Sequence, residues 1–136
     1  MRFLVTILLA IASANCLAQS FSGEWKVDLR SQEQKSKPVE CGFASFNLTQ
    51  QNAKIRGTFS AGTPNCGRMD DGGQVRGIVT SPKSAVLIVQ SARDNSISIG
   101  SASISPSGVL SWETSDHLFE QGDNLIPLRA TFHRLP

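Results

Sequence analysis

The sequence predicts an all-β protein, an eight-stranded antiparallel up-and-down β-barrel with one disulfide. Short segments alternate between apolar and polar residues, which is the period of a strand with one buried face. Gly, Pro, Asn and Ser interrupt these segments about every ten residues, and short turns join antiparallel neighbours. A sheet of this size either splits into a sandwich or closes. We favour closure, because a barrel has no exposed edges.

The first 18 residues are predicted to be a cleaved secretory signal peptide. One Arg precedes an apolar run that is too short to span a bilayer as an anchor, and small residues follow the run. The remaining residues, 19–136, are expected to form a single β-barrel domain. The positively charged region at the start of this leader is short, which is typical of exported bacterial proteins. We therefore expect a periplasmic or secreted protein without a membrane anchor.

Two cleavage sites compete in this leader, one after Ala14 and one after Ala18. Cleavage after Ala18 removes Cys16 and leaves Cys41 and Cys66. An even pair of cysteines in an exported chain is typical of a disulfide, whereas cleavage after Ala14 would leave an odd thiol. We therefore prefer cleavage after Ala18 and expect a disulfide between Cys41 and Cys66.

The first predicted strand, residues 23–30, follows the leader almost directly. Trp25, Val27 and Leu29 lie on one face, and charged residues occupy the other face without a break in the alternation. The polar residues after this strand, 31–38, are expected to form a mobile loop.

The second predicted strand covers residues 41–50 and places Phe46 and Leu48 on one face. Phe43 is out of step with these two residues. A β-bulge near Ala44 would restore the alternation, so we expect a bulge early in this strand.

The other predicted strands alternate in the same way and cover residues 54–60, 74–80, 85–91, 96–104, 109–115 and 125–135. Tight turns that hold Asn, Pro or Gly are expected at residues 51–53, 81–84, 93–95 and 105–108. Longer loops are expected at residues 63–73 and around residues 120–124.

Residues 85–90 read AVLIVQ and are apolar on both faces. A barrel strand with one face in water should alternate, so the outer face of this segment is expected to pack on another subunit or on a protein partner. A slightly apolar surface strand is the alternative interpretation. The segment is therefore the candidate surface for a homo-oligomer.

The predicted disulfide fits the pairing of the second and third strands. If these strands fold about residues 51–53, Cys41 lies opposite residues 62–64, and Cys66 follows one or two steps later. The bond would clamp the open end of the hairpin and stabilise the fold by about 3–4 kcal/mol in the chain-entropy model.

Closure of the barrel places the first strand beside the last one in antiparallel pairing. Trp25 then lies near Phe132 and Arg134, and Arg134 is expected to reach across the indole. A cation over an indole contributes about 0.5–2 kcal/mol. Trp25 would fill the closed end and Arg134 would cap it. An ordinary core Trp with an exposed terminal Arg is the alternative.

An early Gly-x-Trp with a late Arg resembles the closure of lipocalins and avidins. Segments similar to avidin strands and turns are residues 23–31, 57–59, 100–108 and 130–135. The resemblance implies an exported, non-enzymatic binding protein that holds a small apolar or amphipathic molecule at its open end. Ser31, Phe59 and Trp112 are the lining residues that the resemblance implies.

The chain departs from the avidin pattern at two positions that contact biotin in that family. Val27 stands where avidins have a polar residue, and Phe59 stands where they have a Tyr. A ureido group would lose a hydrogen-bond partner at each position, at a cost of about 1–3 kcal/mol each. The resemblance therefore supports the fold and argues against biotin as the ligand.

A second resemblance is to periplasmic inhibitors of proteases and lysozymes, which are also small exported barrels. The early Ser-Gly-x-Trp and the cysteine pair are similar to those of bacterial metalloprotease inhibitors. This resemblance implies an inhibitor or immunity-type protein that binds its target through the loop at residues 66–73. Arg68, Asp70 and Asp71 are the expected contact residues.

The sequence lacks the constellations that catalysis requires. It has two histidines, no tyrosine, and no His or Cys pair at metal-ligand spacing. Its many serines have no evident activating base. We therefore expect no enzymatic activity, no cofactor and no metal. The formal net charge is only +2 with both signs scattered, which gives no support for nucleic-acid binding.

Overall fold

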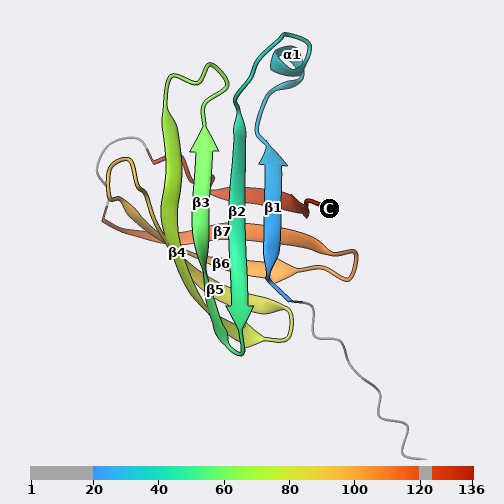
Figure 1. The fold of residues 1–136 in the computed structure, drawn as a ribbon, viewed down its shortest axis with the longest axis vertical. Helices are drawn as coiled ribbons and strands as arrows, with labels where there is room; N and C mark the ends of the chain where they lie inside the picture. The colour runs from blue at the N-terminus through green and yellow to red at the C-terminus, as the bar shows by residue number, and fades with distance from the viewer. Residues whose placement is uncertain (1–19, 120–123) are drawn as a thin grey trace, which may run out of the picture.

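The computed structural model of the chain describes residues 20–119 and 124–136, and the predicted signal peptide lies outside these residues. The strands form a closed barrel in sequence order, and β8 returns to pair with β1 (Figure 1). The predicted eight-stranded up-and-down barrel is therefore confirmed. Its strands are β1 (Gly23–Asp28), β2 (Phe43–Gln51), β3 (Lys54–Gly62), β4 (Met69–Ser81), β5 (Ser84–Gln90), β6 (Ile97–Ile104), β7 (Val109–Phe119) and β8 (Arg129–Arg134).

Aromatic rings fill the middle of the barrel interior. The Phe46 ring contacts the rings of Phe59, Trp112 and Phe132 at centroid distances of 5.3, 5.7 and 4.9 Å. All four side chains are at most 2% exposed. Tilted ring contacts of this kind stabilise a core beyond the apolar area that they bury. The rings occupy the space in which a small ligand would otherwise lie.

The barrel closes where β1 pairs with β8, and Trp25 lies opposite Arg134 in this pair. The Arg134 guanidinium lies 4.2 Å from the centroid of the Trp25 ring. It also donates hydrogen bonds to the carbonyls of Ser20 and Ser22, at 2.7 and 2.6 Å. The indole N–H donates to the carbonyl of Phe21 at 2.9 Å. The predicted capping of Trp25 by Arg134 is therefore confirmed.

The bulge predicted early in β2 is wrong, because the register of β2 runs without a shift against both neighbours. Phe43 instead lies on the outer face of the barrel. Lys26 and Arg30 lie 4.2 and 4.6 Å from the centroid of its ring, and these cations stabilise an aromatic side chain that faces water. A register shift does occur elsewhere, between Phe59 and Ala61 of β3 against β4.

The polar segment after β1 contains one helical turn, α1 (Gln32–Lys35), where only a loop was expected. Ser31 is its N-cap: the Ser31 hydroxyl accepts from the backbone N–H of Gln34, and the Gln34 side chain accepts from the N–H of Ser31. This reciprocal capping box explains why so short a helix forms. No helix in the described part of the chain is long and apolar enough to cross a membrane.

The connections divide the barrel into two different ends (Figure 1). Short turns join β2 to β3, β4 to β5 and β6 to β7 at one end. The longer connections from β1 to β2, from β3 to β4 and from β5 to β6 lie at the opposite end, which we call the loop end. Binding residues concentrate on loops that a rigid scaffold positions, so the loop end is the candidate location of a binding site.

Replacement of Arg134 by Ala should lower the free energy of unfolding by about 2–3 kcal/mol. The substitution removes the cation over Trp25 and two charge-assisted hydrogen bonds. Urea unfolding followed by tryptophan fluorescence measures the change. Arg129→Ala is the matched control in the same strand, because Arg129 pairs with the exposed Glu113 and its loss should change stability by less than about 1 kcal/mol. Equal losses in the two variants would contradict the role of Arg134.

Candidate functional site

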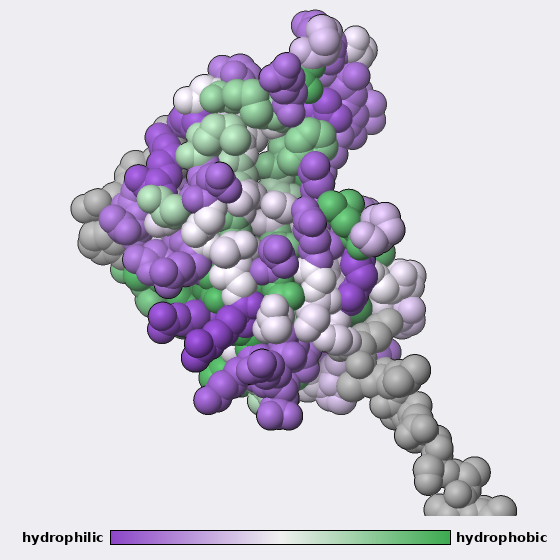
Figure 2. Space-filling model, viewed as in Figure 1, coloured by the Kyte–Doolittle hydropathy of each residue, from purple (hydrophilic) through white to green (hydrophobic). Residues whose placement is uncertain are grey.

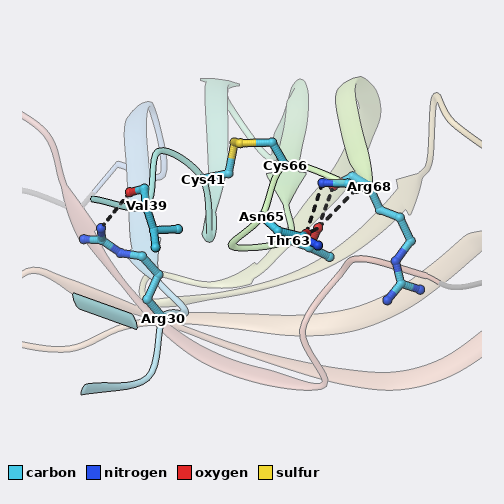
Figure 3. The surroundings of a disulfide bond; sticks show 8 residues. Arg30, Val39, Cys41, Thr63, Asn65, Cys66 and Arg68 are labelled. Carbon is cyan, nitrogen blue, oxygen red and sulfur yellow. Dashed lines mark hydrogen bonds between the residues drawn. A yellow bond between two sulfur atoms is a disulfide. The ribbon is translucent and has the colours of Figure 1, made fainter. Parts of the chain in front are cut away.

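The connection between β3 and β4 is an internally hydrogen-bonded loop, residues 63–68, at the loop end. The N–H of Thr63 donates to the carbonyl of Arg68 at 3.0 Å, and the N–H of Arg68 donates to the Thr63 hydroxyl at 3.1 Å. The side-chain oxygen of Asn65 accepts from the Thr63 hydroxyl and from the N–H of Gly67 (Figure 3). These bonds fix the conformation of the loop in the unbound protein.

The predicted disulfide between Cys41 and Cys66 is confirmed, and it ties this loop to the segment just before β2 (Figure 3). The two Cα atoms are 5.3 Å apart and the cysteines are 25 residues apart in sequence. In the chain-entropy model a crosslink of this span stabilises the folded state by about 3.5 kcal/mol. Internal hydrogen bonds and a covalent bond therefore both hold the loop.

A groove of about 260 Å³ lies beside the disulfide, over the loop ends of β2, β3 and β4. The apolar side chains of Phe43 and Met69 line it, and Met69 is 49% exposed. Glu40 and Asp71 add carboxylates to the lining. Figure 2 shows hydrophobic side chains gathered on this part of the surface with hydrophilic ones around them. We call this feature the disulfide groove.

An ion pair supports the Phe43 wall of the disulfide groove. The Arg30 side chain lies over the Phe43 ring, and its Nε and Nη2 atoms each donate to the Asp28 carboxylate at 2.9 Å. Its Nη1 atom donates to the carbonyl of Val39 at 3.2 Å (Figure 3). The hydrogen bonds from Arg30 lower the pKa of Asp28 from 3.8 to about 2. Arg30 therefore links β1 to the segment before β2 and fixes the position of Phe43.

The structure places two of the predicted contact residues, Arg68 and Asp71, at the loop end, where both are exposed. Arg68 ends the hydrogen-bonded loop, and its side chain extends away from the disulfide (Figure 3). Asp71 lines the disulfide groove and accepts a hydrogen bond from the Ser60 hydroxyl at 3.1 Å. The two residues therefore lie on the same part of the surface as the groove.

Asp70, the third predicted contact residue, is buried rather than exposed. It is 2% exposed, and its carboxylate accepts a hydrogen bond from the N–H of Ala92 at 3.0 Å. The predicted bounds of the loop, residues 63–73, are wrong because β4 already begins at Met69. Asp70 joins β4 to the connection after β5 and contributes to the lining of the disulfide groove with almost no exposed surface.

The residues predicted to line a ligand site do not come together. Phe59 and Trp112 lie in the packed interior, where both contact Phe46. The Trp112 indole N–H donates to the carbonyl of Pro127 at 2.9 Å. Ser31 is exposed and caps α1 outside the barrel. A pocket built from these three residues is therefore not formed.

A polar cluster near the loop end, between β6 and β7, was not predicted from the sequence. Ser98 is 1% exposed, and its hydroxyl hydrogen-bonds the Nδ1 atom of His117 at 2.9 Å and accepts from the side-chain amide of Asn124 at 2.7 Å. Ser96, on the same side of the strand, is also buried, and its side chain interacts with the Asp94 carboxylate. Serine and isoleucine alternate here, and nothing in the alternation itself reveals that the serines face inward.

The groove residues Phe43 and Met69 were also missed as surface residues. The signal for Phe43 was its broken alternation with the rest of β2, since an aromatic residue that faces water in a regular strand is a candidate contact residue. Met69 lay within the predicted loop, where nothing distinguished it from its neighbours.

No group of three or more His, Cys, Asp or Glu side chains within residues 20–119 and 124–136 is placed to hold a metal ion. The closed eight-stranded barrel is compatible with a calycin-like fold. No protein-family model, no curated protein and no solved structure matches the chain. Function is therefore inferred from the geometry of this chain alone.

Arg30→Ala should raise the pKa of Asp28 from about 2 toward its ordinary value of 3.8. The folded-state pKa lies below the unfolded one, so the ion pair contributes stability above a pH of about 4 and loses this contribution as the pH falls through about 2. An NMR titration of the Asp28 carboxyl carbon measures the pKa. Lys35→Ala is the control, because Lys35 lies 3.9 Å from the same carboxylate and is a smaller cause of the shift. An unchanged pKa in Arg30→Ala would contradict the assignment.

Proposed function

We propose that the chain is an exported, non-enzymatic binding protein that docks a protein target, a protease or a lysozyme, against its loop end. The observation that carries this proposal is a ring-filled barrel interior together with a crosslinked loop beside an open groove. A loop that is already fixed loses little conformational entropy on binding, and this supports tight association.

The disulfide groove suits a target side chain that is apolar along its length and cationic at its tip. Phe43 and Met69 offer apolar contact, while Glu40 and Asp71 offer carboxylates. Lys and Arg side chains combine these two properties. Arg68 is the expected anchor for a carboxylate of the target, because a guanidinium binds a carboxylate through two parallel hydrogen bonds.

Arg68→Ala should weaken inhibition of the target by about 30-fold or more, which corresponds to the loss of about 2 kcal/mol that is typical of an interface hot spot. The substitution keeps the backbone hydrogen bonds of the loop. The mature, disulfide-bonded protein is titrated against purified secreted proteases and lysozymes, and the residual enzyme activity is measured. Lys83→Ala is the matched control, because Lys83 is exposed in the β4–β5 turn at the opposite end.

Two outcomes of this titration would count against the proposal. If the wild-type protein inhibits none of the enzymes, the inhibitor function fails. If Arg68→Ala inhibits as strongly as the wild type, the target binds elsewhere than on this loop.

A second candidate function is the binding of a small apolar or amphipathic ligand at the loop end, as the avidin-like and lipocalin-like resemblance implies. The observation that favours it is the inward-facing polar cluster of Ser98, His117 and Asn124 near the loop end, in an interior that is otherwise apolar. A few polar groups placed in an apolar site orient a small ligand and provide specificity.

A fluorescent apolar probe, 1-anilinonaphthalene-8-sulfonate, distinguishes the two functions. A filled interior should give no saturable fluorescence increase with the wild-type protein. Phe46→Ala removes the ring that contacts three others and should create an apolar cavity that takes up the probe, which serves as the positive control. Saturable binding of the probe by the wild type would favour the small-ligand function instead.

A further inference from the structure

The outer face of β4, β5 and β6 carries a continuous apolar strip. Ile78, Val86 and Ile88 are 62%, 42% and 42% exposed, and Ile99 lies half-buried beside Ile88. The strip includes the outward side of residues 85–90, which the sequence marked as apolar on both faces. Branched aliphatic side chains at this exposure, clustered on adjacent strands, mark a surface that another apolar surface covers.

Charges of opposite sign flank the strip. Pairing of the strands sets five residues in one row across the sheet, from β3 to β7, on the outer face. In order they are Arg56, Arg76, Ile88, Ile99 and Asp116. The row therefore runs from two cations through two aliphatic side chains to one carboxylate. We call the surface formed by Arg76, Ile88, Ile99 and Asp116 the β4–β7 face.

Within residues 20–119 and 124–136, the charges of this row have no partner of opposite sign. Arg56 lies directly opposite Arg76, and like charges in this position destabilise a sheet. Among the described residues, no carboxylate forms a salt bridge with either arginine. Asp116 is exposed, and its carboxylate accepts a hydrogen bond from the N–H of the adjacent His117 rather than from a cation. Repulsion between the two arginines destabilises an isolated chain. A partner surface that places a carboxylate opposite Arg76 and a cation opposite Asp116 would offset this repulsion.

We propose that the β4–β7 face binds a second copy of this chain, in a dimer with a two-fold axis parallel to the strands. Such an axis reverses the order of the strands in the partner. Arg76 then lies opposite Asp116 of the partner subunit, and Ile88 lies opposite Ile99 of the partner subunit. Because a two-fold interface is isologous, each ion pair forms twice around one apolar centre. The β4–β7 face is therefore complementary to itself in both charge and apolar contact.

Other occupants fit this face less well. The barrel is closed, so the face has no free strand edge to which a peptide could add a strand. An anionic bilayer would attract Arg56 and Arg76 but would repel Asp116 beside the same strip. A hollow of about 340 Å³ between Arg56, Arg76 and Ile88 also suits a protruding side chain better than a flat membrane. Charges of both signs on one face therefore favour a second copy.

The proposal does not rest on the protein-target function. The disulfide groove lies at the loop ends of β2 to β4, whereas the β4–β7 face lies on the wall of the barrel. A target could bind to the loop end of either subunit without displacing the other copy.

Two charge reversals test the dimer. Arg76→Asp and Asp116→Arg each place like charges opposite each other at both symmetric ion pairs. Each variant alone should raise the dimer dissociation constant by at least about tenfold, in keeping with measured coupling of close interfacial charge pairs. An equimolar mixture of the two variants should associate again, because every like-charge contact becomes an ion pair in the heterodimer. Lys83→Asp reverses a charge in the β4–β5 turn, away from the row, and should dimerise like the wild type.

Sedimentation equilibrium of the mature, oxidised protein measures these dissociation constants. A wild-type dimer, two weakened variants and recovery in the mixture are the expected results. A wild type that stays monomeric to about 1 mM would overturn the proposal, since this limit corresponds to only about 4 kcal/mol of association free energy. A monomer that co-sediments with vesicles of phosphatidylglycerol would overturn it in favour of a membrane. A wild-type dimer whose two variants do not recover on mixing would also overturn this geometry.

Discussion

Closure of the barrel between β1 and β8 is the interaction on which the rest of the structure depends. The register joins six residue pairs between β1 and β2 but only two between β1 and β8. A ladder this short leaves the closure weak unless side chains reinforce it. Arg134 does so, because one guanidinium covers Trp25 and binds two carbonyls that precede β1. Without it both edge strands would be exposed to pairing with other chains.

Closure also decides where a partner can bind. An eight-stranded barrel has an interior just wide enough for side chains, and here rings fill it. Gly100 makes room for one of them, since a Cβ at this position would lie 2.4 Å from a ring atom of Trp112. The residues that remain available to a partner are those of the loop end and of the outer wall. A protein partner of the proposed kind would therefore bind to the surface of the barrel.

Features that follow from antiparallel adjacency could be predicted from the sequence, and features set by more distant neighbours could not. Trp25 with Arg134 was predictable because closure brings the first and last strands together, and the disulfide was predictable because one hairpin brings its cysteines together. Phe43 broke the alternation of β2, but only the positions of two cations show that its ring faces outward. The disulfide groove draws on three strands, so no single segment of the sequence reveals it.

The arrangement of charges on the outer wall of the barrel could not be predicted from the composition. The formal net charge is only +2, and both signs are scattered along the sequence. Three successive strand pairings bring Arg76 to one side of Ile88 and Asp116 to the other. Positive and negative charge are therefore separated across the wall of the barrel, although the net charge of the chain is small. Two copies joined through this wall would present two loop ends, and a target with repeated sites would bind such a pair more tightly than one copy without any new contact.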